Sequence, residues 1–165
     1  MAAESTFKLT YATMFNPPED LHTQFDNELV RLRSELGREH GMIINGKDVF
    51  TPDKFENRSP ADHSQVLGIF QKGTAAEANA AIAAARKAFP AWSHTPWQER
   101  VAIVRKAAAL MDERIYRMGA VNSMEVGKNR MEGLGDIAEA ADLFRYACSR
   151  MEANNGFVTE MGRDP

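Results

Sequence analysis

The second half of the chain, residues 74–154, is a nearly continuous series of helix signals, and this feature constrains the fold most. Thr74 and Glu77 have the spacing of a capping box ahead of an alanine-rich run. Pro90 is expected to end that helix, because proline lacks a backbone N–H and its ring clashes with the preceding turn. The alanines allow close packing on nearly every side, so we expect a buried helix followed by Trp92 as an apolar anchor.

A second helix is expected to follow at once. Thr95 would cap it, Pro96 would take the first helical position and Gln98 the third. One face of this helix is apolar and comprises Val101, Val104, Ala108 and Met111. Helical character continues to Gly127, with a break expected near Gly119 because glycine disfavours helix interiors.

The last helix is expected to run from Asn129 to Asn154. Its apolar residues recur at helical spacing and form one stripe, made of Met131, Leu134, Ile137, Ala138, Ala141, Phe144, Ala147 and Met151. Asn155 and Gly156 follow as a typical helix stop. A stripe of this kind is typical of a helix that packs on one side.

An N-terminal helix is expected to begin at Asn16, with Pro17 at its first position and Glu19 three residues after the cap. Its apolar stripe comprises Leu21, Phe25, Leu29, Leu32 and Leu36. Gly37 is expected to stop this helix, since glycine readily adopts the left-handed conformation found after helix ends.

Between these helical regions the apolar pattern changes to that of short strands. Asn45 and Gly46 lie between two short apolar runs, which predicts a hairpin because both turn residues need a positive φ. Further strands are expected over residues 54–58 and 66–70. The chain is therefore expected to be mostly α-helical with a small antiparallel β-hairpin sheet.

Composition excludes several classes of protein. The formal net charge of -3, with basic residues spread among acidic ones, argues against a nucleic-acid binder. The single cysteine, Cys148, permits no internal disulfide and favours a reducing compartment. Residues 1–15 do not resemble a targeting signal, and no apolar run approaches the roughly 18 residues that span a bilayer. We expect a cytoplasmic protein that binds neither nucleic acid nor membrane.

Several features that suggest chemistry have simpler interpretations. Residues 133–138 match the dinucleotide pattern G-x-G-x-x-A, but no strand precedes them, so the glycines are expected to permit close packing. Gly127 and Lys128 lack the neighbouring glycine and hydroxyl residue of a phosphate-binding loop. Cys148 is expected to be a small buried hydrophobe. The four histidines are too scattered for a metal site.

Glu132, Asp136 and Glu139 are spaced about one helical turn apart and form an acidic face on the last helix. Two interpretations fit this face: a solvated surface, or a carboxylate that points into a cleft and pairs with a cationic ligand group. The residues alone identify no catalytic, cofactor-binding or metal-binding set, so function has to come from resemblance.

Over residues 42–150 the order and spacing of several motifs resemble the aldehyde dehydrogenase superfamily. The motifs are Ile44-Asn45-Gly46-Lys47, Asn57-Arg58-Ser59-Pro60-Ala61, Val66-Leu67-Gly68, the run from Ala80 to Trp92 with Arg100 after it, and Glu125-Val126-Gly127-Lys128. The resemblance implies an α/β aldehyde dehydrogenase-like fold in the complete enzyme. Residues 1–41 would be an N-terminal extension with one long helix. Residues 42–165 would be the N-terminal part of the aldehyde dehydrogenase domain, truncated before the cofactor motif and the catalytic cysteine.

Within the superfamily, residues 33–39, 125–129 and 138–146 are most similar to the 1-pyrroline-5-carboxylate dehydrogenase subfamily. This resemblance implies NAD-dependent oxidation of L-glutamate γ-semialdehyde to L-glutamate in proline catabolism, by an enzyme that would form a homo-oligomer when complete. It also implies that Glu132 binds the α-ammonium group of the substrate.

The catalytic and cofactor-binding residues of the family have no counterpart in this chain, so residues 1–165 alone are expected to be inactive. Two alternatives remain open. The substrate could be another aldehyde or semialdehyde, or the chain could be a non-catalytic helical assembly module whose apolar stripes face a partner protein.

Overall fold

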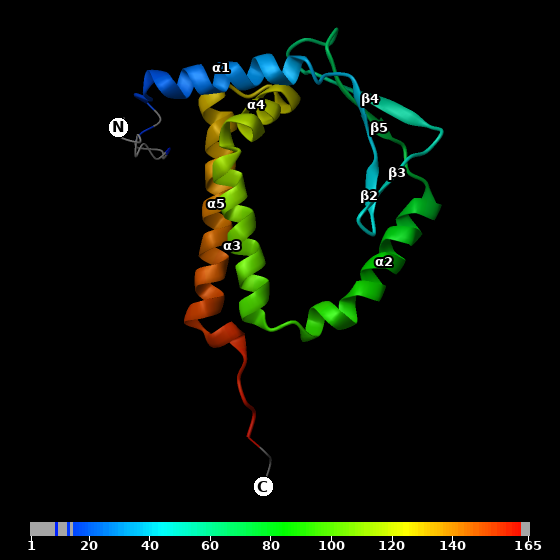
Figure 1. The fold of residues 1–165 in the computed structure, drawn as a ribbon, viewed down its shortest axis with the longest axis vertical. Helices are drawn as coiled ribbons and strands as arrows, with labels where there is room; N and C mark the ends of the chain where they lie inside the picture. The colour runs from blue at the N-terminus through cyan, green and yellow to red at the C-terminus, as the bar shows by residue number, and fades with distance from the viewer. Residues whose placement is uncertain (1–8, 10–12, 14, 163–165) are drawn as a thin grey trace.

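A computed structural model describes the fold over Leu9, Thr13 and residues 15–162. The helices are α1 (Glu19–Arg33), α2 (Ala75–His94), α3 (Trp97–Glu113), α4 (Ile115–Val126), α5 (Arg130–Ala153) and the 3-10 turn η1 (Asn155–Phe157). The strands are β1 (Arg38–His40), β2 (Met42–Ile44), β3 (Lys47–Val49), β4 (Lys54–Arg58) and β5 (Val66–Gln71). In Figure 1, α3 and α5 lie side by side, α1 crosses one end of this pair, and α2 runs from the strands back toward the other end of the pair.

The long helix α5 is the central element, because α3, α4 and η1 all pack against it. The expected span from Asn129 to Asn154 is confirmed, with these two residues as its caps. Fewer residues of α5 are buried than the predicted stripe contains. The buried apolar side chains are Leu134, Ala141 and Cys148, whereas Phe144 of the stripe is 42% exposed. A spacing of seven residues keeps these side chains on one seam, where α3 contributes Val101 and Ala108.

Helices α4 and α5 approach each other closely at two glycines. A Cβ on Gly133 would lie 2.3 Å from the Ser123 hydroxyl oxygen and 2.7 Å from the Gly119 carbonyl oxygen. A Cβ on Gly119 would lie 2.7 Å from the Leu134 side chain. The predicted helix break at Gly119 is therefore wrong. The break lies at Arg114. Gly119 lies inside α4, where only a residue without a side chain leaves room for Leu134.

Helix α1 supplies much of the core at this end of the molecule. Leu21, Phe25 and Leu32 are buried and cluster with residues of α4 and α5, which confirms most of the predicted stripe. The predicted start at Asn16 is wrong, since the helix begins only after Pro18. The helical conformation is disfavoured for a residue that precedes proline, so Pro17, which is followed by Pro18, is a poor residue for the first turn. The helix also ends at Arg33, before Leu36.

The predicted hairpin is confirmed. Strands β2 and β3 pair antiparallel, and the turn residues Asn45 and Gly46 have φ angles of 53° and 72°. Strand β4 covers the expected residues, and β5 extends one residue beyond the expected end. They pair antiparallel.

Strand β1 was not predicted; it pairs in parallel with β5 and gives the sheet order β1-β5-β4. Its residues are polar and exposed, so no apolar alternation marks it. The buried Gln71 side chain joins it to the sheet, donating to Glu39 Oε1 at 2.9 Å and to the His40 carbonyl at 3.0 Å. The His40 ring also stacks on Phe70, with ring centroids 5.0 Å apart.

Helix α2 differs from expectation in two ways. Its capping box at Thr74 and Glu77 is confirmed, but the helix continues through Pro90, and none of its residues is buried. Its main contact within the chain is with β2, so its alanines and the 46% exposed Trp92 do not reach a core. Thr95 ends α2 instead of capping α3, because its N–H and hydroxyl both donate to the Ala91 carbonyl oxygen.

Acid should weaken the contact between α4 and the segment that follows α1. Arg117 on α4 donates to both Glu35 carboxylate oxygens, at 3.2 and 2.7 Å, and this holds the pKa of Glu35 below its ordinary value of 4.5. A carboxylate with a lowered folded-state pKa stabilises the fold above its unfolded pKa, and that stabilisation disappears as the pH falls through the folded value. We expect Glu35→Gln to reduce the loss of thermal stability on acidification below about pH 4.5. The melting temperatures of both proteins are measured across this pH range. If they depend on pH identically, the Glu35–Arg117 pair contributes nothing to stability.

Candidate functional site

The loop between α4 and α5 brings the predicted site residue Glu132 to a defined place. Gly127, with a φ of 74°, ends α4 in the left-handed conformation, and Asn129 begins α5 as its N-cap. Lys128 is the single residue between them. Such a tight reversal places the Lys128 side chain beside the first two turns of α5, where Glu132 and Asp136 lie.

Glu132 occupies the third position of α5 and forms a capping box with Asn129. The Glu132 N–H donates to Asn129 Oδ1 at 3.0 Å, and the Asn129 N–H donates to Glu132 Oε2 at 3.3 Å. This box was not predicted, although an N-cap residue followed three positions later by glutamate is its usual signature. The Glu132 side chain is exposed, and capping uses only part of its capacity, because an ionised carboxylate accepts about four hydrogen bonds.

Asp136 lies one helical turn after Glu132 and pairs with Lys128. The Lys128 Nζ is 2.5 Å from Asp136 Oδ2, and the Asn122 side-chain amide of α4 donates to the same oxygen at 2.8 Å. The pKa of Asp136 is lowered, mainly by the hydrogen bond from Lys128 and to a smaller extent by the hydrogen bond from Asn122. The pKa of Lys128 is raised mainly by its hydrogen bond to Asp136, with further contributions from the charges of Glu132 and Glu139.

The acidic face predicted on α5 therefore contains three carboxylates in unequal situations. Asp136 is neutralised by an ion pair, Glu132 is a helix cap with remaining hydrogen-bonding capacity, and Glu139 is exposed. One ammonium beside three carboxylates leaves an excess of negative charge on this face. A face of this kind attracts a cationic group from solution.

The other motifs considered in the sequence lie in plain structural contexts. Residues 133–138 lie inside α5, where Gly133 is pressed against α4 while Gly135 has open space around it. The prediction of close packing thus holds for the first glycine only. Gly127 is a helix cap.

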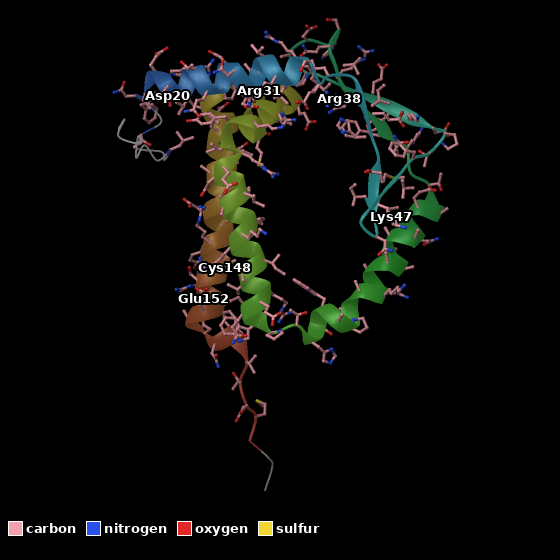
Figure 2. The ribbon with its side chains drawn as sticks, viewed as in Figure 1. Asp20, Arg31, Arg38, Lys47, Cys148 and Glu152 are labelled. Atoms are coloured by element: carbon pink, nitrogen blue, oxygen red, sulfur yellow. The ribbon has the colours of Figure 1, made fainter. Side chains whose placement is uncertain are left out.

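Cys148 is buried, as predicted, and its Sγ lies 3.7 Å from the Val101 carbonyl oxygen of α3. Figure 2 shows it on the C-terminal half of α5, near Glu152. Glu152 in turn pairs with Arg105 of α3, which joins the two helices beside the buried thiol. These contacts are those of a packing residue at a helix seam.

Within the part of the chain that the structure describes, no group of three or more histidine, cysteine or acidic side chains is arranged to hold a metal ion. Among the same residues, no helix combines the length and apolar character that crossing a bilayer requires.

Comparison with known proteins relates this fold to one group of enzymes. The aldehyde dehydrogenase family model matches residues 49–164. The 1-pyrroline-5-carboxylate dehydrogenase 2 of Bacillus subtilis is 35% identical over 127 residues, which are 77% of this chain and 25% of that protein. The 1-pyrroline-5-carboxylate dehydrogenase 1 of Halalkalibacterium halodurans is 37% identical over 133 residues, with 80% and 26% covered. The chain spans about a quarter of the length of these curated relatives.

Solved structures agree with this comparison. A 1-pyrroline-5-carboxylate dehydrogenase from Thermus, solved with bound NAD, matches 100% of this chain and 32% of its own, with a TM-score of 0.84 and 34% identity. The Δ-pyrroline-5-carboxylate dehydrogenase of Mycobacterium tuberculosis matches with a TM-score of 0.79 at 21% identity, which supports the fold alone. The mostly helical chain with its small sheets therefore corresponds to one part of this larger fold. The sheet was predicted to be antiparallel, and the parallel pairing of β1 with β5 corrects that prediction.

Proposed function

The chain belongs to the aldehyde dehydrogenase family, and on this premise we propose that it is the N-terminal part of an enzyme that oxidises L-glutamate γ-semialdehyde to L-glutamate with NAD. The observation that carries the proposal is the 34% to 37% identity, over most of this chain, to proteins named 1-pyrroline-5-carboxylate dehydrogenase. In this proposal the enzyme acts in proline catabolism in the cytoplasm, as a homo-oligomer.

NAD is proposed as the oxidant of the complete enzyme, since a similar structure contains it. The described residues of this chain do not themselves fit a dinucleotide. Residues 133–138 carry the glycine pattern, but they lie within α5 and are preceded by a cap loop where a buried strand would be needed. Other parts of the complete enzyme would therefore bind the cofactor.

The proposed contribution of this chain to the site is Glu132, which would bind the α-ammonium group of the semialdehyde. Its exposure and its place on a face with excess negative charge support this role. A charge-assisted hydrogen bond between carboxylate and ammonium would orient the amino-acid end of the substrate and favour it over a simple aldehyde.

The proposal is tested with the complete enzyme, obtained by reading the gene beyond the codon for Pro165 and expressing the whole reading frame. We expect that frame to encode a cofactor glycine motif and a reactive cysteine, and the product to reduce NAD with L-glutamate γ-semialdehyde. A preference for NADP would show that the proposed cofactor is wrong. A preference for a simple aldehyde such as propionaldehyde would show that the proposed substrate is wrong.

A non-catalytic helical assembly module is the second candidate, because large apolar side chains are exposed on α2 and α5. They are Ile82, Phe89, Trp92, Leu143, Phe144 and Tyr146. A stop codon directly after Pro165 would favour this candidate, since a stand-alone module needs no further chain.

The same exposure predicts how residues 1–165 behave alone. Exposed apolar side chains on several helices favour association, so we expect the isolated polypeptide to self-associate and to show no aldehyde oxidation. Light scattering after size-exclusion chromatography measures the association. A monomer with a sharp cooperative thermal transition would mean that the exposed helix faces need no partner.

A further inference from the structure

The Lys128 ammonium group is an intramolecular competitor for any cation that Glu132 binds, because the charge of Glu132 acts on it. It lies within electrostatic range of Glu132, Asp136 and Glu139, yet among the described residues its side chain donates a hydrogen bond to Asp136 alone. The Lys128 side chain is 37% exposed and therefore has freedom to move between neighbouring carboxylates. Which carboxylate holds this lysine decides which one remains available.

Asp136 is itself fixed in place. It lies on the rigid helix α5, and the Asn122 amide from α4 holds the same carboxylate oxygen that receives Lys128. Glu132, one turn earlier, is bound to the Asn129 N–H at the helix start. The two carboxylates therefore have separate partners, and the lysine is bound to the one farther along the helix.

We propose that Asp136 is a positioning residue that holds Lys128 away from Glu132, so that Glu132 can bind an ammonium group of the substrate. This inference rests on the proposed function of Glu132 and adds a residue that acts through it. Without the Asp136 charge, the lysine would pair with Glu132, the stronger of its two remaining electrostatic partners, and Glu132 would lose affinity for an external cation.

The test uses the complete enzyme and compares KM for L-glutamate γ-semialdehyde with KM for propionaldehyde. Asp136→Asn should raise the first KM by about three- to fivefold, the size of one exposed ion pair, and leave the second unchanged. The double variant Asp136→Asn, Lys128→Met should restore the original KM, because no lysine remains to occupy Glu132. A structural defect at Asp136 would not be rescued by a second substitution.

Glu139→Gln is the matched control, since it removes the same charge from the same face without releasing Lys128. We expect it to leave the KM for propionaldehyde unchanged and to raise the KM for the semialdehyde much less than Asp136→Asn does. A rise equal to that of Asp136→Asn would show that only the net charge of the face matters, and the positioning role would be overturned. Failure of the double variant to recover would overturn it as well.

Failure of the proposed function is distinguishable from failure of this inference. If Glu132→Gln leaves both KM values unchanged, Glu132 has no substrate role and both ideas fall. If Glu132→Gln raises the KM for the semialdehyde alone and Asp136→Asn changes neither KM, the substrate role of Glu132 stands and the positioning role of Asp136 is wrong.

Discussion

Replacing Glu132 by glutamine in the complete enzyme is expected to raise KM for L-glutamate γ-semialdehyde about ten- to a hundredfold. A charge-assisted hydrogen bond is worth about 1.5–3 kcal/mol, and each 1.4 kcal/mol changes affinity tenfold. The KM for propionaldehyde, which has no ammonium group, should stay within about twofold, because the lost interaction is absent there. Steady-state kinetics with both substrates measure this selectivity.

Glutamine is the informative substitution because it keeps the helix cap. Its side-chain oxygen can still accept from the Asn129 N–H, as glutamine does at this position of a capping box. The melting temperature of the variant should therefore match that of the parent enzyme. An equal rise of KM for both substrates would remove the ammonium-binding role and leave Glu132 with capping alone.

The largest effect on stability is expected at Gly133. Gly133→Ala would place a Cβ 2.7 Å from the Gly119 carbonyl oxygen and 2.3 Å from the Ser123 hydroxyl. The serine side chain can rotate, but the backbone oxygen can move only if α4 and α5 separate. We expect a loss of about 1–3 kcal/mol, which is typical of overpacking in a core. The urea midpoint of the 165-residue chain, measured at low concentration to limit association, reports this loss.

Gly135→Ala is the matched control in the same helix. No atom of a neighbouring element lies within 4 Å of the point where its Cβ would stand, so alanine adds no clash there. Alanine favours helix interiors over glycine by about 1 kcal/mol, and the variant should be more stable than the parent. Equal destabilisation at both positions would contradict the close helix contact as the reason for Gly133.

Local patterns predicted the elements whose residues are determined by their immediate neighbours in sequence. The Asn45-Gly46 turn needs positive φ at both positions, and the structure has it. The box of Thr74 and Glu77 begins α2, and the apolar repeat of α5 marks a helix that is present over its full length. Each of these signals acts over a few residues, which is why it can be read without a structure.

Errors arose where a distant contact outweighed a local preference. Gly119 disfavours helix by itself, yet it lies inside α4 because Leu134 packs where its side chain would be. Strand β1 has no apolar alternation, and its pairing depends on β5 and on Gln71, which lies more than thirty residues later. The exposure of the alanine-rich α2 could not be predicted, because it depends on what the helix packs against.

Local sequence patterns were sufficient to locate the helices and the hairpin, and the motifs were sufficient to identify the family. The sequence also placed Glu132, Asp136 and Glu139 on one face of a helix, because that follows from helical periodicity alone. These three carboxylates differ because of contacts that form only in the folded chain: the reversal at Gly127 brings Lys128 to Asp136, and α4 brings Asn122 to the same oxygen. Periodicity assigns a side chain to a face, whereas its charge partner depends on elements that fold back onto that face.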